Sequence, residues 1–286
     1  MSHLKINSIL PPALHVVATP LGNPDDLSER AKYTLRHCDI ILAEDTRITK
    51  QLLHYFDIDG RIISFNAHSE SGKTAKALEA ISCGQALALV VDAGTPGISD
   101  PGQFIVNQAF EMGISVIPIP GPSALTTALS VSGFPASQSL FVGFLPAKAG
   151  SRREALRESL RNKGTIIFYE SPHRIRDLAS QLDEIAVGRT ILIAKELTKK
   201  FEYLVRVPAG QFSQWLDKNS ERIRGEFVIL VGPKHHVESF ISLDVNYLLA
   251  VLARELPPSK AASLCAELTG VPKRILYQKL TVSSDQ

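Results

Sequence analysis

The chain carries the stretch ALALVVDAGTPGISDPG at residues 86–102. The run Ala86–Val91 is apolar throughout, which is the pattern of a strand covered by helices on both faces of a sheet. The residues after it, 92–102, include three glycines, two prolines and two aspartates. A helix cap at Ser99 or Asp100 would account for the second half, but Asp92–Pro96 has more turn chemistry than a connection needs. We therefore predict a ligand-binding loop at the end of a buried strand.

Similar short apolar runs alternate with helical spacing through the first half of the chain. The predicted strands cover residues 14–18, 39–43, 61–65, 86–91 and 114–119. The predicted helices between them cover residues 28–35, 47–56, 71–83 and 102–111. This alternation favours βαβ units, and therefore a first α/β domain, residues 12–122, with a mainly parallel sheet.

A second series begins after a cluster of turn-forming residues at 134–139. Its predicted strands cover residues 139–144, 165–169, 190–194, 203–207 and 226–231. Its predicted helices cover residues 152–160, 173–185 and 209–217. The last two strands are joined by a shorter link, which leaves room for antiparallel pairing. We predict a second α/β domain, residues 123–236, so that the fold class is α/β with two such domains.

A small helical tail, residues 240–286, is predicted after Gly232-Pro233. Helical patterns cover residues 246–255, 260–268 and 272–280. The last two flank a short turn with Gly270, an arrangement that resembles a helix-turn-helix. Two interpretations stay open: a helical pair packed on the second domain, or a nucleic-acid contact surface that uses Lys273, Arg274 and Lys279.

Composition excludes several classes of protein. The 286 residues are 44% hydrophobic and 21% charged, with a net charge of +2, so charge alone does not indicate a nucleic-acid binder. Cys38, Cys83 and Cys265 form no CxxC pair, which favours reduced thiols over a disulfide framework or a zinc site. The longest apolar runs are too short to span a bilayer. We expect a cytoplasmic protein without membrane contact.

Two further loops follow predicted strands at the edge where α/β sheets bind ligands. The loop Thr19–Ser28 contains Gly22 but neither GxGxxG nor GKS/T, so it indicates neither a dinucleotide fold nor a nucleoside triphosphatase. The loop Pro118–Ala124 has three prolines and ends in the small residues Ser123 and Ala124, against which a ligand can lie at a helix start. A purely structural hinge is its alternative.

Charged clusters also end three of the predicted strands. They are Glu44–Arg47, Tyr169–Arg174 and Lys195–Lys199. Taken singly, Asp45 or Ser171 is as well explained by helix capping as by catalysis. Three clusters at one sheet edge favour a polar cleft for an anionic substrate.

A basic helix follows the loop at residues 148–150. It carries Arg152, Arg153, Arg157, Arg161 and Lys163. Interleaved Glu154 and Glu158 make it either a solvated face or a contact for RNA phosphates.

Together these motifs resemble a known family. The segments ATPLGN (18–23), AEDTR (43–47), DAGTPGISDPG (92–102) and PGPS (120–123) are similar to the tetrapyrrole-methylase-fold, or class III, S-adenosylmethionine methyltransferases. More narrowly, GFLPAK (143–148), FYESPHR (168–174) and ELTK (196–199) resemble the members that methylate small-subunit ribosomal RNA. The similarity is colinear from about Leu14 to Gly232.

The resemblance implies a homodimer with S-adenosylmethionine bound between the two domains. It implies methylation of the ribose 2′-oxygen of a cytidine in the decoding region of 16S rRNA, with the small ribosomal subunit as partner and no DNA. Family cofactor contacts correspond to Pro20, Leu21, Gly22, Asp92, Ala93, Gly94, Ile98, Ser123, Ala124, Tyr169 and Leu197. Porphyrin-modifying relatives read GPGD where this chain has Pro20-Leu21-Gly22-Asn23, which argues against a tetrapyrrole substrate.

Methyl transfer to a hydroxyl requires in-line attack and a base. The available carboxylates are Glu44, Asp45, Glu170 and Glu196, and the cations that can hold phosphates or stabilise an oxyanion are Arg47, Arg174 and Lys195. As candidate catalytic residues we rank Asp45 with Arg47 first, and then Glu170 and Glu196.

No metal-ligand motif is present, which favours metal-independent transfer and leaves magnesium open. The alternatives to an RNA methyltransferase are a small-molecule, tetrapyrrole-type methyltransferase and a non-catalytic RNA-binding module that uses the helical tail.

Overall fold

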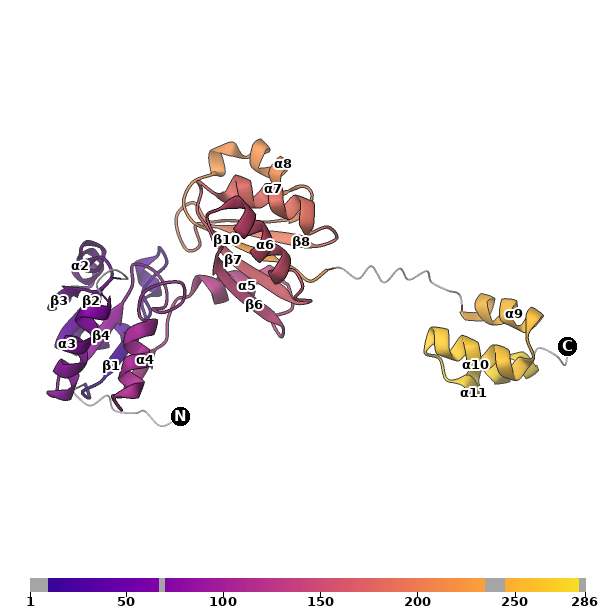
Figure 1. Cartoon of the computed structure of the whole chain (residues 1–286), viewed down its shortest axis with the longest axis horizontal. Coiled ribbons are helices and arrows are strands. Elements are labelled where there is room, and N and C mark those ends of the chain that lie inside the picture. The colour runs from indigo at the N-terminus through magenta and orange to yellow at the C-terminus, as the bar shows by residue number, and fades with distance from the viewer. Residues whose placement is uncertain (1–9, 67–69, 235–244, 283–286) are drawn as a thin grey trace. The chain divides into compact units, whose positions relative to one another are not determined.

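The computed structural model of the chain describes residues 10–66, 70–234 and 245–282. The chain divides into two compact units, residues 1–234 and 235–286. Figure 1 labels most of the helices and strands of both units. The predicted α/β class with a helical tail is confirmed. The predicted boundary at residues 236–240 lies outside the described residues.

The first sheet contains the five strands of the first half of the chain. They are β1 (Leu14–Val17), β2 (Ile40–Ala43), β3 (Ile62–Ser64), β4 (Leu87–Val90) and β5 (Val116–Ile119). Their order is β3-β2-β4-β1-β5, and neighbouring strands are parallel. The mainly parallel sheet predicted from the apolar runs is therefore confirmed, and the carboxyl ends of its strands meet at one edge.

Both faces of this sheet are covered by helices. These are α1 (Glu29–His37), α2 (Thr46–Tyr55), α3 (Glu70–Ser82) and α4 (Gln103–Glu111). Leu87 and Leu89 of β4 join the apolar cluster under α3 and α4, while Ala88 and Val90 join the cluster under α1 and α2. Alternate residues of a strand point to opposite faces, so a strand buried on both faces has to be apolar throughout.

Polar side chains cap the N-termini of two helices at the carboxyl edge of the first sheet. Ser28 caps α1 by accepting a hydrogen bond from the Ala31 amide at 3.1 Å. Asp45 caps α2 by accepting one from the Arg47 amide at 2.8 Å. A short 3₁₀ turn at Pro24–Asp26 precedes α1. Caps of this kind satisfy amides that the helix leaves unpaired.

The second sheet is mixed rather than parallel. Its strands are β6 (Ser139–Phe144), β7 (Thr165–Glu170), β8 (Thr190–Lys195), β9 (Tyr203–Pro208) and β10 (Phe227–Val231). Their order is β6-β7-β10-β8-β9, with β6 and β7 parallel and the other pairs antiparallel. The expected antiparallel pairing of the last two strands is wrong, because β9 and β10 are not neighbours. The link without a helix joins β8 to β9.

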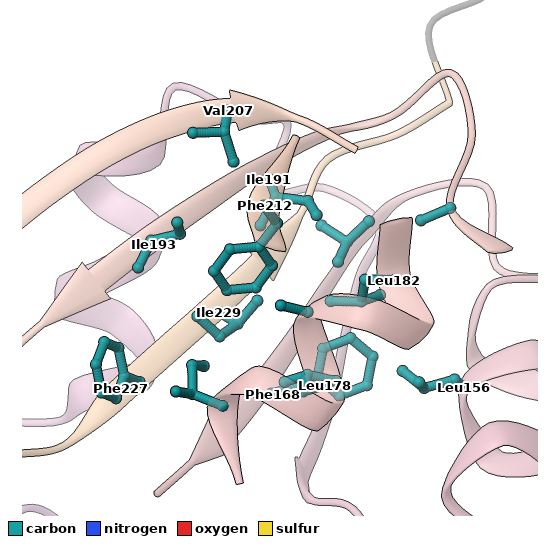
Figure 2. Close-up of a cluster of buried hydrophobic side chains, with 14 of the residues drawn as sticks. Leu156, Phe168, Leu178, Leu182, Ile191, Ile193, Val207, Phe212, Phe227 and Ile229 are labelled. Atoms are coloured by element: carbon teal, nitrogen blue, oxygen red, sulfur yellow. The ribbon is translucent and has the colours of Figure 1, made fainter. Parts of the chain in front are cut away.

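The main core of this second half lies between the sheet and three helices. These are α6 (Ala149–Ser159), α7 (Ile175–Ile185) and α8 (Phe212–Lys218), with a 3₁₀ turn at Ser220–Arg222. Figure 2 shows Phe168, Phe212 and Ile229 at its centre. Helix α5 (Ala124–Ser132), which the periodicity did not predict, supplies Ala128 to a second cluster with Ile167 and Leu230. The second sheet is thus also covered on both faces.

The tail unit is a three-helix cluster with its own small core. It consists of α9 (Val245–Glu255), α10 (Pro258–Thr269) and α11 (Lys273–Val282). Leu249, Cys265 and Leu276 are buried against one another. Gly270 ends α10 in the left-handed conformation, at φ 70°, which favours glycine. No helix in the described parts of either unit is long and apolar enough to span a membrane.

Candidate active site

A cavity of about 320 Å³ lies at the carboxyl edge of the first sheet and is closed by residues of the second. This volume falls in the range of small-molecule sites. The first half of the chain contributes lining residues from the loops after β1, β2, β4 and β5, and the second half from the ends of β6, β7 and β8 and the start of β10. Ten predicted site residues line it: Leu21, Asp92, Ala93, Gly94, Ile98, Ser123, Ala124, Tyr169, Glu170 and Leu197.

The first half of the loop 92–102 is held against the loop after β1. The Thr19 and Gly94 amides donate to each other's carbonyl oxygens at 2.8 and 3.0 Å, and the Thr19 hydroxyl donates to the Val91 carbonyl at 2.9 Å. Gly94 has φ 90°, and a Cβ there would lie 3.4 Å from the Leu21 side chain. A larger residue at position 94 would therefore strain the backbone beside the cavity.

The second half of this loop turns sharply before α4. Ser99 has φ 68°, a conformation rare for residues other than glycine, and the Gly97 amide donates to the Pro101 carbonyl at 3.1 Å. The N-cap of α4 is Gly102, which makes no side-chain cap hydrogen bond. The capping explanation for Ser99 and Asp100 is therefore wrong, and Asp100 instead lines the cavity.

Two glycines allow the halves of the chain to approach beside the cavity. A Cβ at Gly143 would lie 2.6 Å from the Ser99 hydroxyl oxygen, and a Cβ at Gly22 would overlap the Lys199 side chain. Next to Gly22, the Asn23 amide donates to the Thr198 hydroxyl at 3.2 Å. Gly22 therefore makes room for the second half of the chain, and neither it nor Pro20 is among the residues that line the cavity.

The lining is acidic. It contains the carboxylates of Glu44, Asp92, Asp100, Glu170 and Glu226, and within the described chain no lysine, arginine or histidine lines it. Burial raises the pKa of Glu44, Asp92 and Glu170. Burial, followed by repulsion from the neighbouring carboxylates, raises the pKa of Asp100 to about 7. No group of three metal-ligating side chains is found in the ranges that the structure describes.

Asp45 and Arg47, ranked first as catalytic residues, lie beside the cavity and not in its lining. The Arg47 guanidinium donates to the Asp45 carboxylate at 2.6 Å, and together with the Arg47 amide it holds the pKa of Asp45 down to about 2. The Asp45 amide donates to Asp92 at 3.0 Å. Asp45 thus connects the start of α2 to the lining.

Glu170 is buried in the cavity wall. Its Oε1 accepts a hydrogen bond from the Ser171 amide at 2.8 Å and lies 3.2 Å from Nε of Arg174. Its Oε2 is buried without a hydrogen-bond partner among the described residues. An unsatisfied buried carboxylate oxygen is costly, and a bound polar ligand would remove that cost.

Lys195 and Glu196 lie outside the lining: Lys195 ends β8, and Glu196 begins the turn that follows. Glu196 has φ 51°, and its Oε1 accepts hydrogen bonds from Lys199 Nζ and from the Glu226 amide, each at 3.0 Å. Lys195 is a buried strand residue opposite Tyr203 and Phe227. The turn positions Leu197, which does line the cavity.

Comparisons with known proteins identify the family. The model for tetrapyrrole (corrin/porphyrin) methylases matches residues 13–213. The chain belongs to the tetrapyrrole methylase family. Residues 241–281 match the model described as the RsmI C-terminal HTH domain.

Curated relatives identify the group within this family to which the chain is similar. Over 268 residues the chain is 43% identical to ribosomal RNA small subunit methyltransferase I of Xylella fastidiosa strain Temecula1, which covers 93% of this chain and 98% of the relative. It is 42% identical to the protein of the same name from Escherichia coli O157:H7, with 93% of each chain covered. The chain belongs to this group of tetrapyrrole methylases.

Solved structures share the fold of this tetrapyrrole methylase at low sequence identity. Uroporphyrin-III C-methyl transferase from Thermus thermophilus, complexed with S-adenyl homocysteine, has a TM-score of 0.54 and 17% identity. It covers 77% of this chain and 97% of its own. Diphthine synthase has a TM-score of 0.58 and 14% identity, and the match covers 77% of this chain and 90% of the diphthine synthase chain.

Several lining residues of this tetrapyrrole methylase escaped the sequence analysis. Asp100 lay in the quoted stretch but was assigned to a helix cap. Phe144 lies in the GFLPAK segment but was not singled out as a site residue. Glu226–Val228 carry no motif signal and lie at the start of a strand, whereas ligand loops are expected after strand ends.

The basic helix α6 is largely paired with carboxylates. The buried Arg152 lies 3.0 Å from Asp177, Arg153 pairs with Glu184, and Arg161 lies 2.7 Å from Glu158. Arg152 and Arg153 of α6 are thus paired with carboxylates of α7, and Arg161, which follows the end of α6, is paired with Glu158 of that helix. These contacts favour a structural role for that part of the helix.

Proposed function

We propose that this chain is an S-adenosylmethionine-dependent methyltransferase of small-subunit ribosomal RNA. Its target would be the ribose 2′-oxygen of a cytidine in 16S rRNA, in the decoding region. The observation that carries the proposal is the cavity at the carboxyl edge of the first sheet, lined by the same loops that resemble the family's cofactor site. Relatives named as ribosomal RNA small subunit methyltransferase I align over nearly the whole chain, which supports the substrate class.

The lining residues fit S-adenosylmethionine. This molecule carries a positive sulfonium and a positive ammonium group, and the lining supplies carboxylates from Glu44, Asp92 and Asp100. Leu21 and Leu197 provide apolar surface for the uncharged part of the molecule. Ribose hydroxyls donate hydrogen bonds, and the unpartnered Oε2 of Glu170 is an acceptor in the same wall.

The chain contributes positioning and exclusion of water to such a reaction. The bound cofactor supplies an activated methyl group. The Thr19–Gly94 bridge and the left-handed Gly94 hold one wall of the cavity in a fixed shape, so that the reacting atoms can be aligned. Leu21 and Leu197 exclude water from this side. Arg47, largely exposed and paired with Asp45 beside the cavity, is suited to contact an RNA phosphate.

We propose that the tail unit binds the RNA and that the protein is a cytoplasmic homodimer. Helix α11 exposes Lys273 and Arg274 at its start, where helix-turn-helix proteins contact nucleic acid. Helix α4 and its end expose Phe104, Phe110 and Met112, an apolar surface of the kind that dimer contacts cover.

The proposal is tested by transfer of labelled methyl from S-adenosylmethionine to small ribosomal subunits and to free 16S rRNA, followed by mapping of the modified nucleotide. We expect label on a cytidine ribose. Absence of transfer to either substrate, with normal binding of S-adenosylhomocysteine, would contradict the RNA substrate. Transfer to a tetrapyrrole instead would support the small-molecule alternative. Failure of any cofactor to raise the melting temperature would support a non-catalytic RNA-binding protein.

A further inference from the structure

The five carboxylates of the cavity differ in how they are engaged. Glu44 accepts a hydrogen bond from the Asp92 amide at 3.3 Å, and Asp92 accepts one from the Asp45 amide at 3.0 Å. Glu226 lies 3.1 Å from Lys199 Nζ. Asp100, in contrast, has no hydrogen-bond or ion-pair partner in the part of the chain that the structure describes. Asp100 is thus the carboxylate with neither oxygen engaged among the described residues, whereas Glu170 has one engaged oxygen, Oε1, and one without a partner, Oε2.

The backbone holds Asp100 in this place. The left-handed Ser99 precedes it, and the hydrogen bond from the Gly97 amide to the Pro101 carbonyl closes the turn around it. The close approach of Ser99 to Gly143 adds a contact from the second sheet. A strained backbone that neighbouring contacts maintain is typical of functional sites.

A second observation places a ligand against the same lining. The buried Oε2 of Glu170 has no partner among the described residues, although Glu170 is only 1% exposed. The apolar side chains of Phe144 and Tyr169 line the cavity beside it, with their ring centroids 5.8 Å apart. The cavity thus combines one unengaged carboxylate with an acceptor that lacks a donor.

We propose that Asp100 is the catalytic base that accepts the proton of the substrate hydroxyl during methyl transfer. This inference rests on the proposed function and replaces Asp45, whose carboxylate is occupied by Arg47 and by the start of α2. The hydroxyl O–H bond breaks and its proton passes to the Asp100 carboxylate. The oxygen forms a bond to the methyl carbon as the carbon–sulfur bond breaks, and the electron pair of that bond stays on sulfur.

The surroundings of Asp100 suit this role. Burial first, and then the charges of Glu44, Asp92 and Glu226, together raise its pKa to about 7. Tyr169 also faces it, and its own pKa is raised to about 12, by burial first. A base is most effective when its pKa lies near the working pH, whereas the pKa of Asp45, at about 2, makes it a weak base.

Charge balance supports the same assignment. A positive sulfonium in the cavity favours the ionised form of Asp100 before transfer. Transfer removes that positive charge, so the carboxylates then favour uptake of one proton. Asp100 therefore keeps the proton released by the hydroxyl, in the same cavity in which the sulfonium charge was lost.

The test compares single-turnover methyl transfer to the same RNA by wild type, Asp100→Asn and the control Asp59→Asn. Asp59 is an exposed aspartate of the first half of the chain, away from the cavity. We expect the wild-type rate to rise with pH and level off once Asp100 is ionised. Asp100→Asn should be slower by about 10²–10⁴-fold and should lack that rise. Asp59→Asn should behave as wild type.

Two readouts do not depend on activity. Asp100→Asn should bind S-adenosylhomocysteine as tightly as wild type in calorimetry, since that molecule lacks the sulfonium charge and its ammonium group keeps the carboxylates of Glu44 and Asp92. The raised pKa of Asp100 means that its ionisation disfavours the folded state, so this group lowers stability as pH rises from about 4 towards about 7. The melting temperature of Asp100→Asn should therefore exceed that of wild type by more at pH 8 than at pH 5.

The outcomes separate the two proposals. An active wild type with an equally active Asp100→Asn would overturn the assignment of the base alone. Parallel loss of rate and of S-adenosylhomocysteine affinity would also overturn it, because it would show that Asp100 only maintains the cavity. A wild type that methylates no RNA but binds S-adenosylhomocysteine would overturn the proposed function, and this inference with it.

Discussion

The two walls of the cavity are built differently. The wall from the first sheet consists of loops that follow parallel strands, and it presents the backbone of Gly94 and the carboxylates of Glu44, Asp92 and Asp100. The wall from the second sheet includes the side chains of Tyr169, Leu197 and Val228 and carries two carboxylates, Glu170 and Glu226. The first wall supplies most of the carboxylates and a fixed backbone, and the second supplies most of the apolar surface.

The difference follows from sheet topology. In a parallel sheet all carboxyl ends lie at one edge, so motif loops that are far apart in the sequence converge there. In the mixed sheet β10 runs antiparallel to β7 and β8, and Phe227 lies opposite both Glu170 and Lys195. The start of β10 therefore meets the ends of its neighbours at the cavity. Three predictions test this division between the walls.

The largest effect is expected from Gly94→Val in the first wall. The left-handed backbone at position 94 disfavours a β-branched residue by about 1–3 kcal/mol, and the new side chain would project beside Leu21. We expect S-adenosylhomocysteine binding to be lost in calorimetry. Gly84→Val is the matched control, because Gly84 has a similar φ of 94° with open space around it. Equal affinity of Gly94→Val and wild type would remove this loop from the binding site.

A smaller effect is expected from Tyr169→Leu in the second wall. The Tyr169 ring packs edge-to-face against Phe141 and Phe144, and aromatic contacts contribute about 0.5–1.5 kcal/mol each. We expect S-adenosylhomocysteine affinity to fall by about tenfold in calorimetry. Tyr203→Leu is the control, since Tyr203 stacks on Trp215 and is not a lining residue. An equal loss in both variants would show a general effect on the second sheet.

The smallest effect is expected from Asp45→Ala, beside the first wall. The variant loses the cap of α2 and the ion pair with Arg47, so the melting temperature at neutral pH should fall slightly while S-adenosylhomocysteine affinity is unchanged. The lowered pKa of Asp45 stabilises the fold above about pH 4, and this contribution is lost as pH falls towards about 2. Thermal unfolding should therefore show the two proteins converging in acid. Loss of cofactor binding in Asp45→Ala would place Asp45 in the site after all.

The sequence by itself determined the strands and the loops that end them. Buried strands have to be apolar, so periodicity predicted β6 with its observed bounds and β4 to within one residue at each end. Turn chemistry then identified residues 92–102 as a loop with more than a structural role. The family followed from motifs in the same loops, and the comparisons confirm it.

Only the tertiary structure decided which side chains are engaged and which are free. Arg47 pairs with Asp45, and Lys199 pairs with Glu196. Asp100 lines the cavity and has no ion-pair partner among the described residues. Val228 reaches the lining because β10 is antiparallel to its neighbours. Pairing and strand direction depend on contacts between segments distant in the sequence. Local residue patterns therefore located the site, and the tertiary structure decided which of its side chains line the cavity and which are paired.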